Sequence, residues 1–408
     1  MSKNFAARNF WGFVPAGLLC SLLLSFCALL SPAAASAGEN AGVTAAPILQ
    51  LNTSARAAGM GSAFTAVSDD ASALLFNPAG LSLLDHRELS FDYMKGFVDQ
   101  NVEHISLVSP LPLSGLLGNG YASMGGSMLF AQNGTIEVNR TNPDGSLRDS
   151  RSISAGGDFV GQLAYSERLL ETTLENERGG RALEMNHYFG FAGKYIRSTL
   201  AEQYSASAFA GDAGYLVKIP DYRLTLGAAA QNFGSEMKFI EEGDPLPLTF
   251  RGGAAWVLPL DAYTNPPNQA LLFSGDGDWL YHEKEWHANL GIEYSAMRTY
   301  SARIGYQLNR DAAGLTFGFG VLWQGLRFDY AWALSEALGD VHRFSVTWRF
   351  GRVSQRKREV APRPFIESMP EREDIREIEK KTPEVIEDRP RRPRRTISDN
   401  DVAPGWIY

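Results

Sequence analysis

Cysteine is almost absent from this sequence, with two residues in 408, Cys20 and Cys27. Both lie within residues 1–37, which we interpret below as a cleaved secretion signal. A mature chain without cysteine has no disulfides, no thiol nucleophile and no cysteine metal site. An exported chain of this kind must be stabilised by burial or by a closed hydrogen-bonded architecture.

The N-terminus has the three parts of a signal peptide. Lys3 and Arg8 precede an apolar run over residues 13–30, and Ala35-Ser36-Ala37 supplies the small residues that a signal peptidase requires. The mature chain is expected to start at about Gly38. A retained membrane anchor is the alternative, and the small-residue site with the polar residues after it favours cleavage.

Long hydrophobic runs are absent after the signal. No later stretch approaches the roughly 18 apolar residues of a membrane helix, which excludes a helical membrane protein. Instead, residues 87–350 alternate with a period of two, as strands with two different faces do. In 341–350 (VHRFSVTWRF), Phe344, Val346 and Trp348 share one face, opposite Arg343 and Ser345.

Such alternation fits either a soluble sandwich or an outer-membrane barrel. Strands of about ten residues, aromatic residues near strand ends, and a charged inner face favour the barrel. So many charges suit a wet lumen better than a packed core. The lumen-facing charges that we predict are Glu293, Arg303, Arg327, Asp329, Arg343 and Arg349.

The strand count follows from parity, because a bacterial barrel with both ends in the periplasm has an even number of strands. The candidate strands are 87–94, 102–109, 120–131, 134–140, 155–167, 186–197, 204–218, 222–233, 247–258, 269–274, 286–295, 299–308, 314–323, 325–334 and 341–350. Joining 120–140 into one strand, with Asn133-Gly134 as a bulge, gives 14. The segments 141–154 and 275–285 are then outer loops, and 168–185 and 259–268 are long periplasmic turns.

Catalytic and metal motifs are scarce. His282 and His287 are five residues apart, whereas the zinc motif needs a spacing that puts both on one face. Residues 275–278 (GDGD) have calcium-like spacing without further acidic ligands, so an exposed turn is expected. The adjacent Asp69 and Asp70 suit a loop or helix start better than a paired-carboxylate site. We therefore predict no enzyme, no catalytic residues, no metal site and no cofactor.

The last segment, residues 352–408, has 14 basic and 12 acidic side chains, several prolines and no strand period. This composition predicts a largely disordered periplasmic tail. Its basic stretch 389–395 could suggest nucleic-acid binding, but export makes that partner unexpected. A solvated tail and a tail that docks to a partner remain alternatives.

Residues 38–86 resemble the N-terminal block of the PorV/PorQ family of outer-membrane proteins, a branch of the FadL-like barrels. The resemblance rests on 55–61 (ARAAGMG), the acidic pair, 77–81 (NPAGL), and the strand ending at Trp348-Arg349-Phe350-Gly351. It covers roughly residues 50–351. It implies a 14-stranded antiparallel transmembrane barrel over 87–351, with 38–86 folded into the lumen as a hatch. The hatch motif residues are then Gly59, Gly61, Asp69, Asp70, Asn77, Pro78, Ala79 and Gly80.

The resemblance implies two functions. PorV-type proteins serve type IX secretion and surface attachment, with secretion-machinery or cargo proteins as partners. FadL-like relatives carry hydrophobic small molecules across the outer membrane. Both place the chain among the lipids of a Gram-negative outer membrane, and the PorV type is the leading expectation. The charged tail departs from the simplest family pattern and puts the secretion role in doubt.

Overall fold

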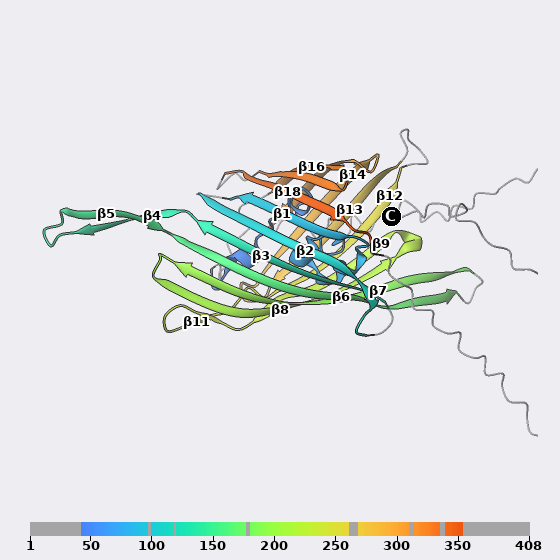
Figure 1. Cartoon of the computed structure of the whole chain (residues 1–408), viewed down its shortest axis with the longest axis horizontal. Coiled ribbons are helices and arrows are strands. Elements are labelled where there is room, and N and C mark those ends of the chain that lie inside the picture. The colour runs from blue at the N-terminus through green and yellow to red at the C-terminus, as the bar shows by residue number, and fades with distance from the viewer. Residues whose placement is uncertain are drawn as a thin grey trace, which may run out of the picture. The chain divides into compact units, whose positions relative to one another are not determined.

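A closed antiparallel sheet makes up most of the chain in the computed structural model (Figure 1). The structure describes residues 42–96, 99–117, 120–176, 180–260, 268–309, 314–334 and 339–353. The expected signal peptide, and the predicted tail from residue 354 on, lie outside these ranges. Within them, no helix is long and apolar enough to cross a bilayer.

The barrel contains 14 strands, which confirms the predicted fold class. They are β1 (Arg87–Lys95), β2 (Gln100–Ser114), β3 (Tyr121–Asn133), β6 (Gly156–Asn176), β7 (Gly180–Leu200), β8 (Tyr204–Ile219), β9 (Leu224–Gly234), β12 (Thr249–Pro259), β13 (Gln269–Leu280), β14 (Glu285–Ala296), β15 (Tyr300–Leu308), β16 (Leu315–Trp323), β17 (Leu326–Ala333) and β18 (Val341–Phe350). Each pairs with its sequence neighbour in the ring, and β1 closes the ring against β18 from Arg87↔Phe350 to Lys95↔His342. Closure leaves no strand edge in the barrel unpaired.

The two faces of the strands are inverted relative to a soluble protein. In β17, Phe328 and Trp332 are exposed on the outside, whereas Arg327, Asp329 and Ala331 are buried inside. Exposed Phe, Leu, Tyr and Trp side chains recur around the outer face. An apolar outside with charges inside is the arrangement of a membrane-embedded barrel.

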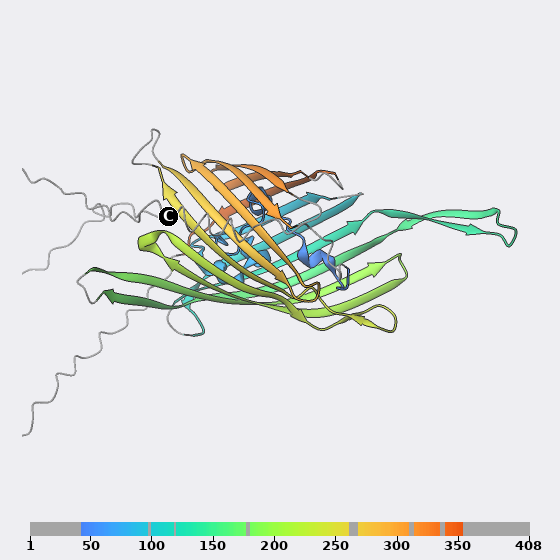
Figure 2. The ribbon, with the colours of Figure 1, turned by 180° about the vertical axis from the view of Figure 1, so that it is seen from behind.

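We call the end where β1 begins and β18 ends the terminal end, and the opposite end the far end. The prediction that 120–140 continues as one strand with a kink at Asn133-Gly134 gives the right count, but only its first part belongs to the barrel. After Asn133 the strand is interrupted at Gly134, which has a φ of 74°, and continues as β4 (Thr135–Thr141). β4 pairs with β5 (Leu147–Ser154) in a separate ribbon that extends from the far end (Figure 2). The predicted loop 141–154 is therefore mostly strand.

Two other loop predictions also change. β3 stops pairing with β6 at Ala122↔Glu167, but β6 and β7 go on pairing with each other as a hairpin. Most of 168–185, which was predicted to be a turn, is therefore strand. Residues 275–280 belong to β13. A small sheet of β10 (Met237–Lys238) and β11 (Gly243–Asp244) lies between β9 and β12, and a short helix η3 (Pro220–Tyr222) joins β8 to β9. Residues 261–267 lie outside the described ranges.

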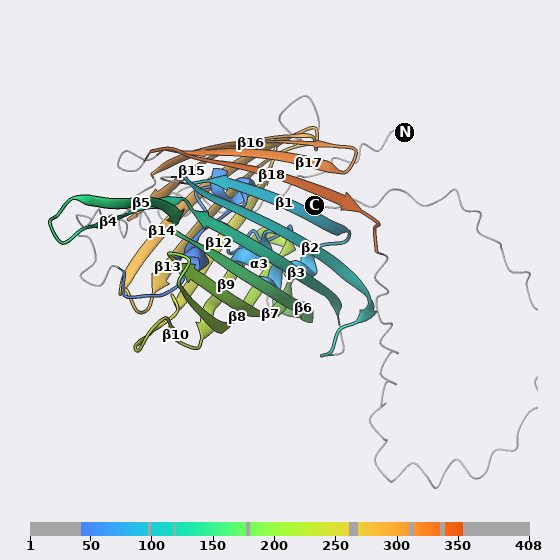
Figure 3. The same cartoon turned by 60° about the vertical axis from the view of Figure 1, so that its left-hand side comes forward.

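The segment before β1 lies inside the barrel, where Figure 3 shows its helices behind the strands. It contains η1 (Pro47–Gln50), α2 (Ala55–Gly59), α3 (Ala73–Phe76) and η2 (Pro78–Leu83), and we call residues 42–86 the inner segment. α2 contacts β15 to β18, and η2 contacts β2, β3, β6, β7 and β8. Nearly all residues from 53 to 84 are buried.

Candidate functional site

Three arginines and three carboxylates form a closed ring of ion pairs between the inner segment and the barrel wall. Following the ring, Arg56 pairs with Asp70, Asp70 with Arg327, Arg327 with Asp329, Asp329 with Arg303, Arg303 with Glu293, and Glu293 with Arg56 again. The six nitrogen–oxygen distances lie between 2.5 and 3.0 Å. All six side chains are at most 10% exposed. We call this set the charge ring.

The charge ring alternates in sign and sums to zero. This matters because an unpaired charge in a buried site costs several kcal/mol, whereas a fully paired and hydrogen-bonded set is tolerated. Two members, Arg56 and Asp70, come from the inner segment, and the other four come from β14, β15 and β17. The ring therefore ties the segment to one side of the wall.

Glycine makes the ring geometrically possible. Arg303 on β15 reaches Asp329 on β17 across the intervening strand β16, which presents Gly320 between them. A Cβ at Gly320 would overlap the Asp329 carboxylate and lie 3.0 Å from both Arg303 Nη atoms. At Gly318, two residues earlier, a Cβ would lie 3.0 Å from the Gly59 Cα. The inner face of β16 is thus kept flat for the ring and for α2.

The predicted acidic pair divides between two environments. Asp70 is buried and accepts from both Arg56 and Arg327, whereas the side chain of Asp69 is 47% exposed and contacts Arg56 from outside the ring. Burial alone raises the pKa of the Asp70 carboxyl, but the Arg327 and Arg56 guanidiniums outweigh burial and hold that pKa well below its usual range. Asp70 therefore stays ionised at neutral and mildly acidic pH.

The Asn77-Pro78-Ala79-Gly80 motif anchors the other side of the inner segment. Asn77 caps η2 by accepting from the Ala79 backbone N–H at 3.1 Å, and its amide donates to the Thr65 and Tyr215 carbonyls. Its φ of −153° is extended, as a residue before proline prefers. The motif lies against Gly190 and Gly214 of β7 and β8, where a Cβ would overlap its backbone or side chain. Asn77, Pro78, Ala79 and Gly80 are all buried.

The other predicted residues are placed as follows. Gly59 and Gly61 pack directly on the wall, and a Cβ on Gly305 of β15 would overlap the Gly61 nitrogen. Arg343 donates to the Asn52 carbonyl at 2.7 Å. Arg349 does not join the ring but pairs with Glu88 at 3.0 Å. The structure thus brings four of the six predicted lumen charges together in the ring.

Sequence reasoning missed Arg56, Glu88 and Asp276. Glu88 accepts from the Ala71 backbone N–H, and Asp276 accepts from the backbone N–H groups of Phe64 and Thr65, each bond 2.7 Å long. The expectation that 275–278 forms an exposed turn is wrong, because Asp276 and Asp278 are buried inside β13. Their alternation with glycine at period two is a strand signal that could have identified them.

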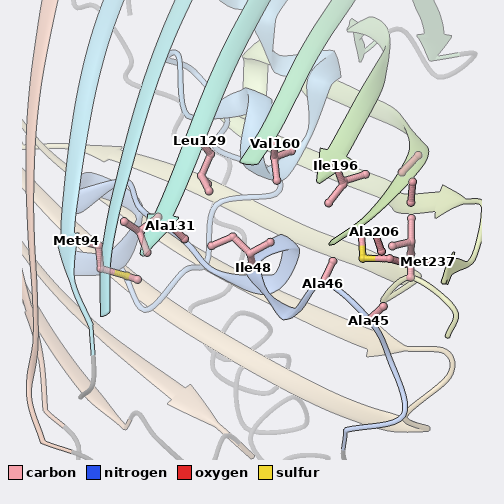
Figure 4. Close-up of a cluster of buried hydrophobic side chains, with 14 of the residues drawn as sticks. Ala45, Ala46, Ile48, Met94, Leu129, Ala131, Val160, Ile196, Ala206 and Met237 are labelled. Carbon is pink, nitrogen blue, oxygen red and sulfur yellow. The ribbon is translucent and has the colours of Figure 1, made fainter. Parts of the chain in front are cut away.

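Both lumen walls of the described barrel carry buried polar side chains. The wall of β12 to β18 and β1 carries the ring and further polar side chains, including Asp276, Asn289, Ser345 and Asp92. The wall of β2 to β9 carries many small and apolar side chains, together with the buried ion pair of Lys194 and Asp212. At the far end, apolar side chains from both walls form one cluster with Ala45, Ala46 and Ile48 of the inner segment (Figure 4). The wall members of this apolar compartment include Met94, Val102, Leu129, Ala131, Val160, Ile196, Ala206, Ala208, Met237 and Leu246.

The two histidines of residues 282–287 lie in different elements. His282 lies in the turn after β13 and His287 lies on β14. Across the described ranges, no group of three or more His, Cys, Asp or Glu side chains could hold a metal ion. The acids of the charge ring are all held by arginine.

Comparison with known proteins gives one family and several distant structures. The profile of an uncharacterised protein family, UPF0164, matches residues 25–142. A UPF0164 protein of Treponema pallidum (strain Nichols) is 29% identical over 224 residues, which are 54% of this chain and 52% of that protein. The chain thus spans about half the length of the curated relative that it matches.

Among solved structures, the chain is similar to a deltaS2 mutant of the TodX monoaromatic hydrocarbon channel, with a TM-score of 0.44 and 11% identity over 74% of this chain and 98% of that chain. It is also similar to a Pseudomonas aeruginosa FadL homologue, with a TM-score of 0.40 and 12% identity over 73% and 98%. Outer membrane phospholipase A of Escherichia coli follows at 0.28 and 11% identity, over 66% and 98%. At these TM-scores we infer function from this chain's own residues.

Proposed function

We propose that the chain is a non-enzymatic outer-membrane channel for hydrophobic small molecules, with the inner segment as its hatch. The apolar outer face and the closed ladder support a place in a bilayer. β1 begins and β18 ends at the same end of the barrel, and we assign that end, with the tail after it, to the periplasm. The outer membrane of a Gram-negative-type bacterium is the membrane that such barrels occupy.

The observation that carries this proposal is the apolar compartment at the far end. Ile48, 3% exposed, packs there among apolar residues of the barrel wall. An apolar molecule that entered from outside would find the same contacts by displacing a short stretch of η1. Burial of apolar surface contributes about 25 cal/mol per Å², which gives such a molecule a driving force.

A hatch role for the inner segment is supported by its two anchors. The charge ring holds α2 and Asp70 on one side, and the Asn77 motif holds η2 on the other. Buried, mutually paired charges offer no free base or nucleophile to a substrate, which supports a non-enzymatic role. η1 lies outside these two anchors and contributes Ile48 to the apolar compartment. A ligand that enters the compartment would therefore displace η1 first.

The test uses two neighbouring residues of β8 that face opposite sides. Ala208 is 2% exposed in the apolar compartment, whereas Phe209 is 68% exposed on the outer wall. Ala208→Trp should fill the compartment and lower both the binding of the apolar fluorophore N-phenyl-1-naphthylamine to purified protein and hydrocarbon uptake by cells. Phe209→Trp is the matched control and should leave both unchanged. Equal uptake by cells with and without the gene would refute the channel.

A PorV-type role in protein secretion and surface attachment is the second candidate function. It is favoured by the β4–β5 ribbon, whose two strands pair only with each other and which is exposed along its length. Free strand edges can receive another chain by strand addition. Replacing residues 135–154 by a two-residue turn should then abolish secretion and the recovery of cargo in pull-downs from outer membranes, but not hydrocarbon uptake. Normal secretion after this deletion, or after deletion of the gene, would exclude the secretion role.

A further inference from the structure

A groove on the outer wall lies where the β4–β5 ribbon leaves the barrel. Its volume is about 440 Å³, and its lining includes Phe130, Gln132, Phe159, Arg197 and Glu202. Phe130 and Phe159 pack against each other in a tilted arrangement, with their ring centroids 5.1 Å apart. The groove therefore combines an aromatic pair with charged groups.

The cation of the groove, Arg197, has no ion-pair partner among the described residues, whereas the acids that line it are contacted by other groups. Glu202 accepts from the Ser154 N–H at 3.0 Å and lies 3.8 Å from Arg151, and Asp158 accepts from Asn133 at 3.3 Å. Arg197, on β7, makes no ion pair with any residue of the described ranges. The groove thus offers a guanidinium to an anionic group, and guanidiniums bind phosphate in a bidentate geometry.

Register shows that Arg197 stands at the border between the apolar and polar zones of the outer wall. Its cross-strand row is Phe130, Phe159, Arg197 and Ser207. The next outward-facing row toward the far end is polar or small: Gln132, Gly157, Thr199 and Ser205. The next row toward the barrel centre is Met128, Gly161, Tyr195 and Phe209, which is mostly apolar. In a bilayer this border lies at the level of the lipid headgroups.

Toward the barrel centre from Arg197, the outer wall has a position without a side chain. Gly193 faces outward there, and a Cβ placed on it would meet no atom within 4 Å. Its cross-strand neighbours are Gly211 and the exposed Leu163. An acyl chain running down from Phe159 would lie over these two glycines, beside Leu163.

We propose that this groove binds one phosphate-bearing lipid of the outer leaflet, with the phosphate on Arg197 and an acyl chain over Gly193. The occupant is a lipid rather than free phosphate, because Phe130, Phe159 and Leu163 give apolar contacts that inorganic phosphate cannot use. The lipid site uses only the outer wall and goes beyond the proposed channel function, since cargo passes through the lumen. A negative result in the channel assay would not exclude the lipid site, and a negative result in the lipid assay would not exclude the channel.

The test is native mass spectrometry of the full-length protein in detergent, titrated with dioleoyl phosphatidylglycerol. Wild type should bind one molecule in preference to others, and Arg197→Ala should weaken that binding roughly fivefold, the effect of about 1 kcal/mol for one interfacial arginine. Arg148→Ala, in the exposed ribbon, is the matched control and should bind as wild type does. Gly193→Leu should weaken binding independently, because its side chain would occupy the place of the acyl chain over Gly193.

Arg197→Lys covers the case in which the alanine variant does not fold, and should retain part of the affinity. A gel shift between unheated and boiled samples checks that each variant is folded. Equal binding by wild type and Arg197→Ala, or equal binding of uncharged dioleoylglycerol, would overturn the proposal. Displacement of the lipid by millimolar inorganic phosphate would show a phosphate site without lipid selectivity and would overturn it as well.

Discussion

Arg56→Met is the sharpest test of the charge ring, because Arg56 is the only cation that the inner segment contributes to it. The substitution keeps much of the apolar stem but removes the guanidinium that contacts Asp69, Asp70 and Glu293. Asp70 keeps Arg327 and Glu293 keeps Arg303, so each carboxylate loses one of its two arginines. The ring is opened and left with a net charge of −1 in a buried site.

The expected cost is about 3–5 kcal/mol, the usual penalty for removing one partner of a buried ion pair. The substitution should lower the free energy needed to open the inner segment, because Arg56 lies in α2. The hydrogen-bonded strands of the barrel do not contain Arg56 and should keep their stability. Hydrogen–deuterium exchange of residues 55–84 measures this local opening. Exchange there should accelerate by at least roughly 100-fold, since each 1.4 kcal/mol is a factor of ten.

Two further variants make the test specific. Arg298→Met, in an exposed turn, is the matched control and should exchange as wild type does. Adding Asp70→Asn to Arg56→Met restores neutrality, so the double variant should cost less than the sum of the two single variants. Exchange of residues 55–84 that is the same in Arg56→Met and Arg298→Met would refute the idea that the ring holds the segment.

Three other predictions concern the remaining contacts of the inner segment. Asn77→Ala removes the cap on the Ala79 N–H and the hydrogen bonds to the Thr65 and Tyr215 carbonyls. It should weaken the closed state by about 1–3 kcal/mol and raise liposome permeability to large solutes; wild-type permeability in a folded barrel would contradict a hatch. Gly318→Val forces a side chain against α2 and should lower the free energy of unfolding by about 1–3 kcal/mol, whereas Gly252→Val, where a Cβ meets no atom within 4 Å, should not. The hydrogen bond to Glu88 raises the pKa of His86 above its ordinary value of 6.5. The stability that His86 adds is therefore present below pH 6.5 and lost as pH rises through the raised pKa; His86→Gln should remove this dependence from thermal melts between pH 6 and 9.

Most of the fold could be predicted from the alternation of apolar and polar residues along the strands. In 341–350 and 325–334 it separated an aromatic face from a charged face without ambiguity, because side chains in a strand must alternate whatever their partners are. It failed at 134–141, where a strand pattern continues past the barrel. Alternation reports local conformation, and whether a strand pairs inside the ring or only with β5 depends on residues far away in the chain.

The charge ring illustrates the same limit. Glu293, Arg303, Arg327 and Asp329 were expected to face the lumen, but nothing in their spacing shows that they meet. Glu293 and Arg303 are cross-strand partners, and Arg303 reaches Asp329 only because β16 has a glycine between them. Arg56 belongs to the block that carries the family resemblance, but the sequence does not predict its ion pairs, because its partners lie far away in the chain.

By itself, then, the sequence determined the all-β class, the even strand count and the division of each strand into an outer apolar and an inner polar face. These properties follow from local chemistry repeated along the chain. Only the tertiary structure decided that six charges meet in a ring on one lumen wall, that apolar side chains gather around Ile48 at the far end, and that Arg197 borders a groove. Those features arise between residues up to hundreds of positions apart, and no local pattern encodes which of them closure of the barrel will bring together.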